Sequence, residues 1–272
     1  MVVARILVAT AEGLQTLGDG VDVELSGRDV RALARDEEGW WVVAEEGVLL
    51  RGRQQDWQEV ARADVPMTCL LPASERLFAG TAGAGLRHLV DGRLEPVQAF
   101  DETPGRHTWY TPWGGPPATR SLSAHPDGTL FVNVHVGGIV RSRDGGRSWE
   151  PTIDVDLDVH EVRVEPRSGR VLAATGAGGF ALSEDRGDSW QLSREGLHAG
   201  YCRAVAVAGT TILLSASTGP RTRRGAVYRR SLNGEGPFER CQRGLPAWFE
   251  GNVDTGWLDA VGGLAVLATP AG

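Results

Sequence analysis

The chain has 272 residues, of which 41% are hydrophobic and 23% charged, so it can bury a sizeable core. Its net charge of −7 gives no electrostatic reason to bind nucleic acid or an anionic membrane surface. No apolar run approaches the roughly 20 residues of a membrane span, and residues 1–10 lack a signal-peptide pattern. We therefore expect a cytoplasmic protein without nucleic-acid or membrane partners.

Apolar segments, each followed by a glycine, recur along the chain. The segments are residues 6–9, 40–44, 77–80, 130–136, 171–175 and 211–216, and the glycines are Gly13, Gly47, Gly85, Gly138, Gly179 and Gly225. One full repeat carries four strand signals, at residues 161–165, 171–175, 180–183 and 189–192. Four short strands in about 40 residues are typical of a β-propeller blade. We predict an all-β propeller of four-stranded antiparallel blades in a single domain, residues 1–272.

A seventh apolar segment, residues 264–269, follows the six glycine-marked repeats. Seven repeats therefore predict seven blades. The N-terminal blade would hold its second to fourth strands, and the C-terminal blade only its first two. Six blades remain an alternative, in which the C-terminal first strand completes the N-terminal blade.

Two eight-residue segments, 142–149 and 183–190, share the pattern S-x-D-x-G-x-x-W at a spacing of 41 residues. The fixed positions are Ser142, Asp144, Gly146 and Trp149 in the first copy and Ser183, Asp185, Gly187 and Trp190 in the second. Asp and Ser side chains can bond the backbone N–H groups of such a turn, and Gly can supply a positive φ. The Trp can cover the hairpin with its large apolar face. We expect these positions to be structural rather than catalytic.

With these two boxes and the blade period, the chain resembles the BNR/Asp-box superfamily of sialidase-like β-propellers. It looks most similar to uncharacterised bacterial BNR repeat proteins that are described as glycosyl-hydrolase-like. The resemblance implies the propeller fold and leaves the activity open. The Arg-Ile-Pro element of sialidases is here Arg5-Ile6-Leu7, and no clear Arg triad comes from separate blades. We do not expect true sialidase activity.

The predicted topology divides the loops between two faces. Loops between second and third strands share a face with the links between blades, and the boxes mark the opposite face. In propellers the first of these faces usually surrounds the mouth of the central channel and carries ligand sites. The candidate catalytic residues expected there are His135, His160, Asp158 and Asp254. The candidate ligand-binding residues are Trp109, Trp113, Arg120, Asn133, His198, Tyr201, Arg203, Arg221 and Asn252.

Three functions fit these residues. Our first hypothesis is the binding of a small polar or anionic molecule, sugar-like molecules included, or of a segment of a partner protein. The alternative is a glycoside hydrolase or lyase at the same face, with His135 or His160 as acid or base and Asp158 or Asp254 as its partner. A protein-interaction scaffold that uses the blade rims is the third.

Metal binding is considered for the same residues, because His135, His160 and an Asp could supply nitrogen and oxygen ligands. None of them shows the close spacing of a metal motif. The three cysteines, Cys69, Cys202 and Cys241, are odd in number and widely spaced, which suggests neither a disulfide framework nor a zinc module. We predict reduced cysteines and no metal or other cofactor.

Overall fold

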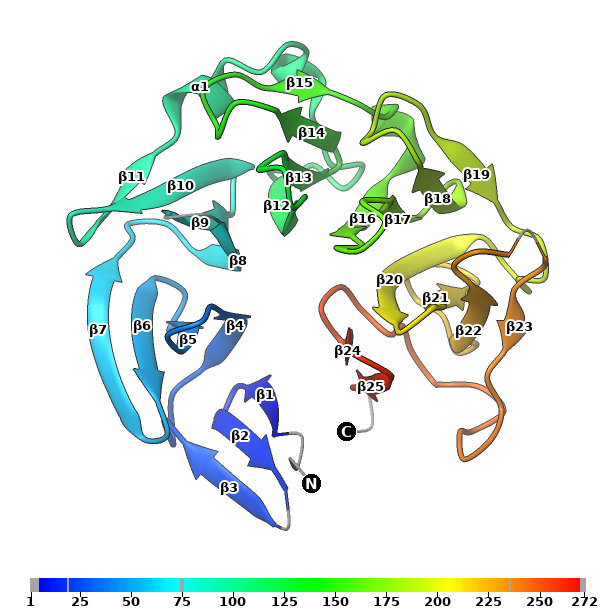
Figure 1. Cartoon of the computed structure of the whole chain (residues 1–272), viewed down its shortest axis with the longest axis horizontal. Coiled ribbons are helices and arrows are strands. Elements are labelled where there is room, and N and C mark those ends of the chain that lie inside the picture. The colour runs from blue at the N-terminus through cyan, green and yellow to red at the C-terminus, as the bar shows by residue number, and fades with distance from the viewer. Residues whose placement is uncertain (1–4, 19, 74–75, 235, 270–272) are drawn as a thin grey trace.

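The computed structural model describes residues 5–18, 20–73, 76–234 and 236–269. Its strands form seven antiparallel sheets arranged around a central axis (Figure 1). The first sheet contains β1 (Ile6–Thr10), β2 (Gly13–Leu17) and β3 (Val21–Glu24). The second and third contain β4 (Val30–Arg35), β5 (Trp40–Ala44), β6 (Val48–Arg53), β7 (Asp56–Arg62), β8 (Met67–Ala73), β9 (Arg76–Thr81), β10 (Gly85–Val90) and β11 (Arg93–Pro96).

The other four sheets continue around the ring. The fourth and fifth contain β12 (Ala118–Ala124), β13 (Leu130–His135), β14 (Gly138–Ser142), β15 (Glu150–Pro151), β16 (Val159–Val164), β17 (Val171–Thr175), β18 (Gly179–Ser183) and β19 (Gln191–Ser193). The sixth contains β20 (Tyr201–Ala208), β21 (Thr211–Ser217), β22 (Ala226–Ser231) and β23 (Glu239–Arg240), and the last β24 (Leu258–Val261) and β25 (Leu264–Leu267).

This arrangement confirms the all-β propeller and its seven repeats. The first and last sheets have three and two strands, so the incomplete C-terminal blade is also confirmed for the described residues. In a six-bladed ring, β24 would pair with β1. Instead β24 pairs with β25 in a separate sheet, and β25 and β1 face each other where the two ends of the chain approach (Figure 1).

The hydrophobic core lies between the blades. The five residues of β17 are all buried, because both faces of this strand pack against neighbouring blades. Side chains of the fifth blade, such as Leu172 and Phe180, share one cluster with Val205 and Leu214 of the sixth. Each blade is therefore stabilised largely by its neighbours in the ring, as expected for a repeat architecture.

The recurring glycines allow the outer strand to approach the hairpin. A Cβ atom on Gly47 would lie 2.8 Å from the carbonyl oxygen of Ala63. On Gly179, whose φ is +83°, it would lie 2.9 Å from the carbonyl oxygen of Ser193. Both separations are too short for a side chain, so the repeat preserves glycine at the start of the third strand.

The two S-x-D-x-G-x-x-W segments, called here the box turns, form the hydrogen bonds expected from their sequence. Asp144 Oδ1 accepts the backbone N–H groups of Arg147 and Ser148, both at 2.9 Å. Ser142 Oγ accepts the N–H of Gly146 at 2.8 Å. In the second copy, Ser183 Oγ accepts from Gly187 at 2.6 Å and Asp185 Oδ1 from Ser189 at 2.8 Å. The carboxylates therefore satisfy N–H groups of the turns, which agrees with the structural role expected for them.

Both box carboxylates should make stability depend on acid pH. Hydrogen bonds from Ser148 and Ser189 lower the pKa of Asp144 and of Asp185 from 3.8 to about 2. Because each pKa is lower in the folded than in the unfolded chain, the ionised carboxylate stabilises the fold at pH values above the unfolded pKa of 3.8. This stabilisation is lost as the pH falls toward 2. We expect a variant with both D144N and D185N to lose less stability than the wild type between pH 4 and pH 2. Urea unfolding at each pH measures this, and parallel pH profiles of the two proteins would contradict it.

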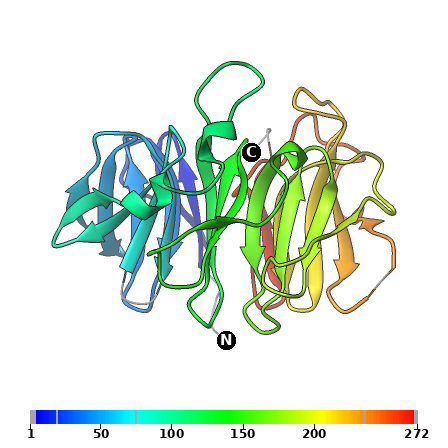
Figure 2. The same ribbon diagram turned by 90° about the horizontal axis from the view of Figure 1, so that it is seen from above.

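The box turns lie on the face opposite the long loop between β11 and β12. Arg186 of the second box turn forms an ion pair with Asp127 of the β12–β13 hairpin at 2.7 Å, so the box turns and the first hairpins share a face. The long loop contains the short helix α1 (Gln98–Asp101) and the 3-10 turn η1 (Arg106–Thr108) and rises from the other face (Figure 2). The faces assigned from the sequence are therefore those of the structure.

Cys69, Cys202 and Cys241 are free thiols in the structure. Burial raises the pKa of Cys69 and of Cys202 to about 12, which keeps both thiols protonated at neutral pH. No helix in the described part of the chain is long and apolar enough to span a membrane. The cytoplasmic location stays a prediction.

Candidate ligand site at the channel mouth

Each innermost strand of the five four-stranded blades carries one extra residue relative to its partner. The pairing skips Arg31 in β4, Thr68 in β8, Arg120 in β12 and His160 in β16, and in β20 Arg203 and Ala204 lie opposite the single residue Ser215. Such β-bulges re-aim a side chain and are frequent beside functional sites. Three of the bulged residues, Arg120, His160 and Arg203, are candidates identified from the sequence.

His135, Asp158 and His160 form one cluster on this face. His135 is the last residue of β13, and its Nε2 atom lies 3.0 Å from Asp158 Oδ1. The Nε2 atom of His160 lies 3.4 Å from Asp158 Oδ2. The two imidazole rings are 4.9 Å apart between centroids. Asp158, in the segment between β15 and β16, thus lies between a residue of β13 and a residue of β16. The three residues are up to 25 positions apart in the sequence.

Backbone contacts orient two members of this cluster. His160 is fully buried, and its Nδ1 atom lies 2.7 Å from the carbonyl oxygen of Cys202. Because a carbonyl only accepts, Nδ1 carries a hydrogen, and Nε2 is the nitrogen that lies near the Asp158 carboxylate. Asp158 follows the 3-10 turn η2 (Val155–Leu157) with a φ of +52°, and its carbonyl oxygen accepts the N–H of Gly176 at 2.8 Å.

The cluster contains a negative charge between two histidines. Burial raises the pKa of Asp158, but the contacts from His135 and His160 outweigh it, and the pKa lies well below its usual value. Burial also lowers the pKa of His135, and the nearby Arg120 adds to this effect while Asp158 opposes it. At neutral pH the cluster therefore holds an ionised carboxylate beside a neutral His135.

Arg203, Tyr201 and Asp254 form a second group beside the first. Arg203 forms an ion pair with Asp254 and donates to the Tyr201 hydroxyl at 3.1 Å. The Tyr201 ring lies 5.0 Å from that of His160. Burial opposes the charge of Arg203, but Asp254 outweighs it and raises the pKa of the guanidinium. The structure thus joins six of the predicted residues into a continuous polar surface.

Arg120 is the unpaired cation of this surface. Its guanidinium forms no hydrogen bond or ion pair with any described residue, and its Nη1 atom is buried without a partner. Burial lowers the pKa of Arg120, and the attraction of Asp254 opposes this while Arg203 adds to it. A buried guanidinium nitrogen without a partner is costly, so its presence needs an explanation.

The aromatic residues of the long loop have different positions. Trp113 has 65% of its surface exposed and packs against His135 in a tilted arrangement, at 5.3 Å between ring centroids, so it lies beside the histidine cluster. Trp109 instead packs against Phe100 at 5.7 Å, and the Arg106 guanidinium lies over the Trp109 ring at 4.7 Å. Its large apolar ring is used to fold the loop, and the expected wall position of Trp109 is corrected accordingly.

Four more expected ligand contacts have other roles or positions. Asn133 is fully buried and donates to the carbonyl oxygen of Val159 at 2.8 Å, so it joins two blades. His198 bonds the Tyr228 hydroxyl at 2.7 Å in a separate aromatic group. Asn252 holds the loop after β21 through the carbonyl oxygen of Pro220 at 3.0 Å. Arg221 is exposed on that loop.

Two further residues shape the site and were not identified from the sequence. A Cβ atom on Gly176 would lie 2.3 Å from Asp158 Oδ2, so only glycine leaves room for the carboxylate. Thr255 donates to the carbonyl oxygen of His160 at 3.1 Å and bridges the fifth blade to the last. Gly176 could have been identified from its position in the loop between the second and third strands of its blade. Nothing in the sequence distinguishes Thr255.

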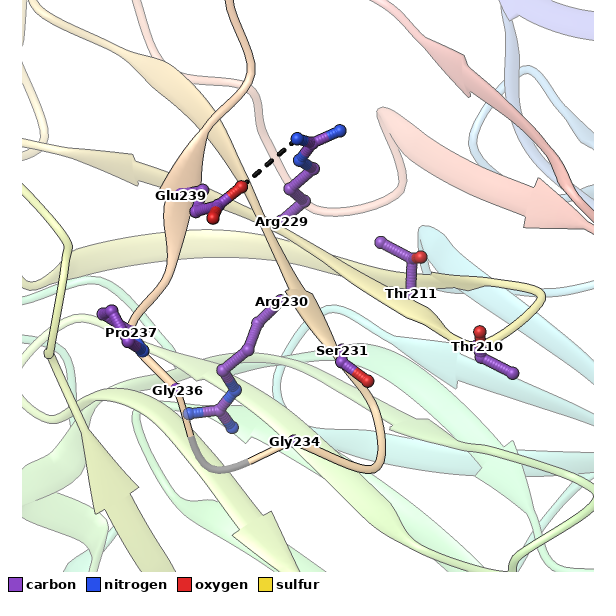
Figure 3. Close-up of a pocket in the computed structure, with 9 residues that line it drawn as sticks. All are labelled: Thr210, Thr211, Arg229, Arg230, Ser231, Gly234, Gly236, Pro237 and Glu239. Atoms are coloured by element: carbon purple, nitrogen blue, oxygen red, sulfur yellow. Dashed lines mark hydrogen bonds and ion pairs between the residues drawn. The ribbon is translucent and has the colours of Figure 1, made fainter.

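A separate open cavity of about 420 Å³ lies at the rim of the sixth blade (Figure 3). Its charged lining residues Arg229 and Glu239 pair with each other at 3.2 Å, as the dashed line shows. The Arg230 guanidinium lies over the rings of Phe180 and Phe238 at 4.8 and 4.4 Å. Because its charges are paired or stacked, this cavity is a weaker ligand candidate than the channel mouth.

No family model and no curated protein matches the chain. Solved structures match its fold. YCF48 from Cyanidioschyzon merolae superposes with a TM-score of 0.64 at 11% identity, over 99% of this chain and 95% of that one. YCF48 bound to a D1 peptide gives 0.61 at 14%, over 90% and 82% of the chains. A chain of a nidogen–laminin complex gives 0.59 at 13%, over 84% and 89%. At these identities the similarity extends to the β-propeller fold alone.

Proposed function

We propose that this chain is a binding propeller of the Asp-box kind whose channel mouth captures an anionic group, such as a carboxylate, of a small polar molecule. The unpaired Nη1 atom of Arg120 carries this proposal. A guanidinium matches a carboxylate through two parallel hydrogen bonds, so a bound anion would satisfy the donor that the protein leaves free. Trp113, exposed beside His135, offers an apolar face for the remainder of the ligand.

A partner segment with a free carboxylate is the second candidate, because one similar structure is YCF48 bound to a D1 peptide. Both candidates use the same contact at Arg120. Short peptides with a free or an amidated C-terminus, compared with carboxylate- and phosphate-bearing sugars, separate the two ligand classes.

We expect the R120Q variant to bind a carboxylate probe about 10- to 100-fold more weakly than the wild type, since hydrogen bonds to charged groups contribute about 1.5–3 kcal/mol. Isothermal titration calorimetry of chelator-treated protein measures this. The matched control is R221Q, because Arg221 is exposed on the same face. Equal losses in R120Q and R221Q, or no binding of any carboxylate or phosphate probe to the wild type, would contradict the proposal.

The same substitution should leave stability unchanged or raise it. Glutamine removes a guanidinium whose Nη1 atom is buried without a partner. A side chain kept for binding costs stability in the free protein, whereas one kept for folding contributes to it. Thermal unfolding of R120Q without ligand distinguishes these roles, and a clear fall in Tm would assign Arg120 to the fold.

A further inference from the structure

The donor atoms of His135, Asp158 and His160 all lie within 4.8 Å of one another. The carboxylate oxygens are 3.0 Å from His135 Nε2 and 3.4 Å from His160 Nε2. In a tetrahedral site with bonds of about 2.0–2.2 Å, neighbouring ligand atoms are about 3.3–3.6 Å apart. The three side chains can therefore contact one small cation once the farthest pair of donor atoms, up to 4.8 Å apart, approaches by about 1.2–1.5 Å.

The surroundings of His160 point to a ligand more directly. Its Nε2 atom is buried and has no hydrogen-bond partner among the described residues, although the side chain is fully enclosed. Its Nδ1–H is held by the carbonyl oxygen of Cys202. A histidine that binds a metal through one nitrogen usually donates its other N–H to a carbonyl or carboxylate, which fixes the tautomer. His160 has this arrangement.

We propose that His135, Asp158 and His160 bind one divalent transition-metal ion of the Zn²⁺ type. Two imidazole nitrogens and one carboxylate suit such an ion better than Ca²⁺ or Mg²⁺, which prefer oxygen ligands. Three protein ligands leave at least one coordination position open. The charge of Arg120 near this cluster opposes a bare cation and favours an anion in that position.

Asp158 and Gly176 provide the variants that test the site. Asp158 has a φ of +52°, which asparagine tolerates well, and its carbonyl bond to Gly176 does not involve the side chain, so D158N should fold. In G176A the new Cβ atom displaces the Asp158 carboxylate while the backbone keeps an allowed conformation. The matched control is D156N, because Asp156 is an exposed carboxylate two residues away.

Calorimetric titration of chelator-treated full-length protein with Zn²⁺, without any carboxylate probe, should give one ion per chain. We expect D158N to weaken Zn²⁺ binding by at least about 100-fold, since even outer-shell partners typically contribute 10- to 100-fold. G176A should weaken it by about tenfold or more, and D156N should bind like the wild type. Circular dichroism and urea unfolding verify that each variant is folded.

Absence of Zn²⁺ binding to the wild type would overturn the proposal. So would equal binding by folded D158N and wild-type protein. The Co²⁺ complex provides a second readout, because its visible spectrum reports nitrogen and oxygen ligands in a site of low coordination number. This test uses no anionic ligand and the Arg120 test uses metal-free protein, so either proposal can fail without the other.

Discussion

Replacement of Trp149 by alanine is expected to lower the free energy of unfolding by about 3–5 kcal/mol, the range for a large aromatic residue removed from a core. Trp149 is 6% exposed, and its ring meets that of Phe100 edge to face at 5.2 Å. Its indole N–H also donates to the carbonyl oxygen of Gly146 at 3.2 Å. The substitution therefore leaves a cavity and removes a hydrogen bond within the box turn. Urea unfolding followed by far-ultraviolet circular dichroism measures the loss.

The second box turn supplies the matched control. Trp190 occupies the same motif position but is only partly buried, and its buried Nε1 atom has no partner. We expect W190A to cost less than about 2 kcal/mol, within the ordinary range of single substitutions. Equal losses in W149A and W190A would show that the box tryptophans act through the turn itself rather than through their burial.

The second large effect is expected at Glu161, which follows the bulge of β16. Its side chain is 1% exposed, accepts the N–H of Val205 at 3.0 Å and forms an ion pair with Arg163 at 3.0 Å. Burial raises the pKa of Glu161, and Arg163 opposes this shift. In E161A a buried N–H of the sixth blade loses its acceptor, and Arg163 keeps only its longer ion pair with Asp259 at 3.5 Å. We expect a loss of about 3 kcal/mol, at the low end for a broken buried pair, because Arg163 is 35% exposed and can be hydrated.

Ser121 provides the comparison, because it holds the same place after the bulge of β12. Its Oγ atom accepts the N–H of Val162 at 2.9 Å, as the Glu161 carboxylate accepts that of Val205. S121A removes this neutral acceptor and a long hydrogen bond from Ser121 Oγ to Asn133 Oδ1 at 3.5 Å, and it should cost about 1–2 kcal/mol. E161Q keeps an acceptor for Val205 and should lose less than E161A in equilibrium urea unfolding. An E161A variant as stable as S121A would show that the ion pair contributes nothing.

The propeller could be predicted because its signals are local. The glycine that starts each third strand and the box turns depend on residues near each other in sequence, as the hydrogen bonds of Asp144 show. Second strands such as β17 are buried along their whole length, so each can be recognised in the sequence as a continuous apolar segment. The number of repeats and the incomplete last blade followed from these patterns.

The site was harder to predict, because its geometry depends on contacts between blades. The alternation of side chains along a strand correctly placed Asn133 and His135 on the same side of β13. It does not show how far each side chain lies from the channel mouth. His135 ends the strand and reaches Asp158, whereas Asn133 lies deeper and bonds the backbone of the next blade. The ion pair between Arg203 and Asp254 joins residues 51 positions apart, and the sequence specifies no such pairing.

The bulges of the innermost strands have a consequence for how this mouth can change. A residue that the ladder skips does not determine the register of its strand, and Arg31, Thr68, Arg120 and His160 occupy this position in successive blades. Their diversity shows that the scaffold accepts cationic, hydroxyl and imidazole side chains there without altering the blades. Thr68 also donates to the carbonyl oxygen of Thr119, and His160 Nδ1 contacts that of Cys202, so the bulged residues line the mouth and join neighbouring blades at the same time. A substitution at one of these positions therefore changes both the chemistry of the mouth and a contact between blades.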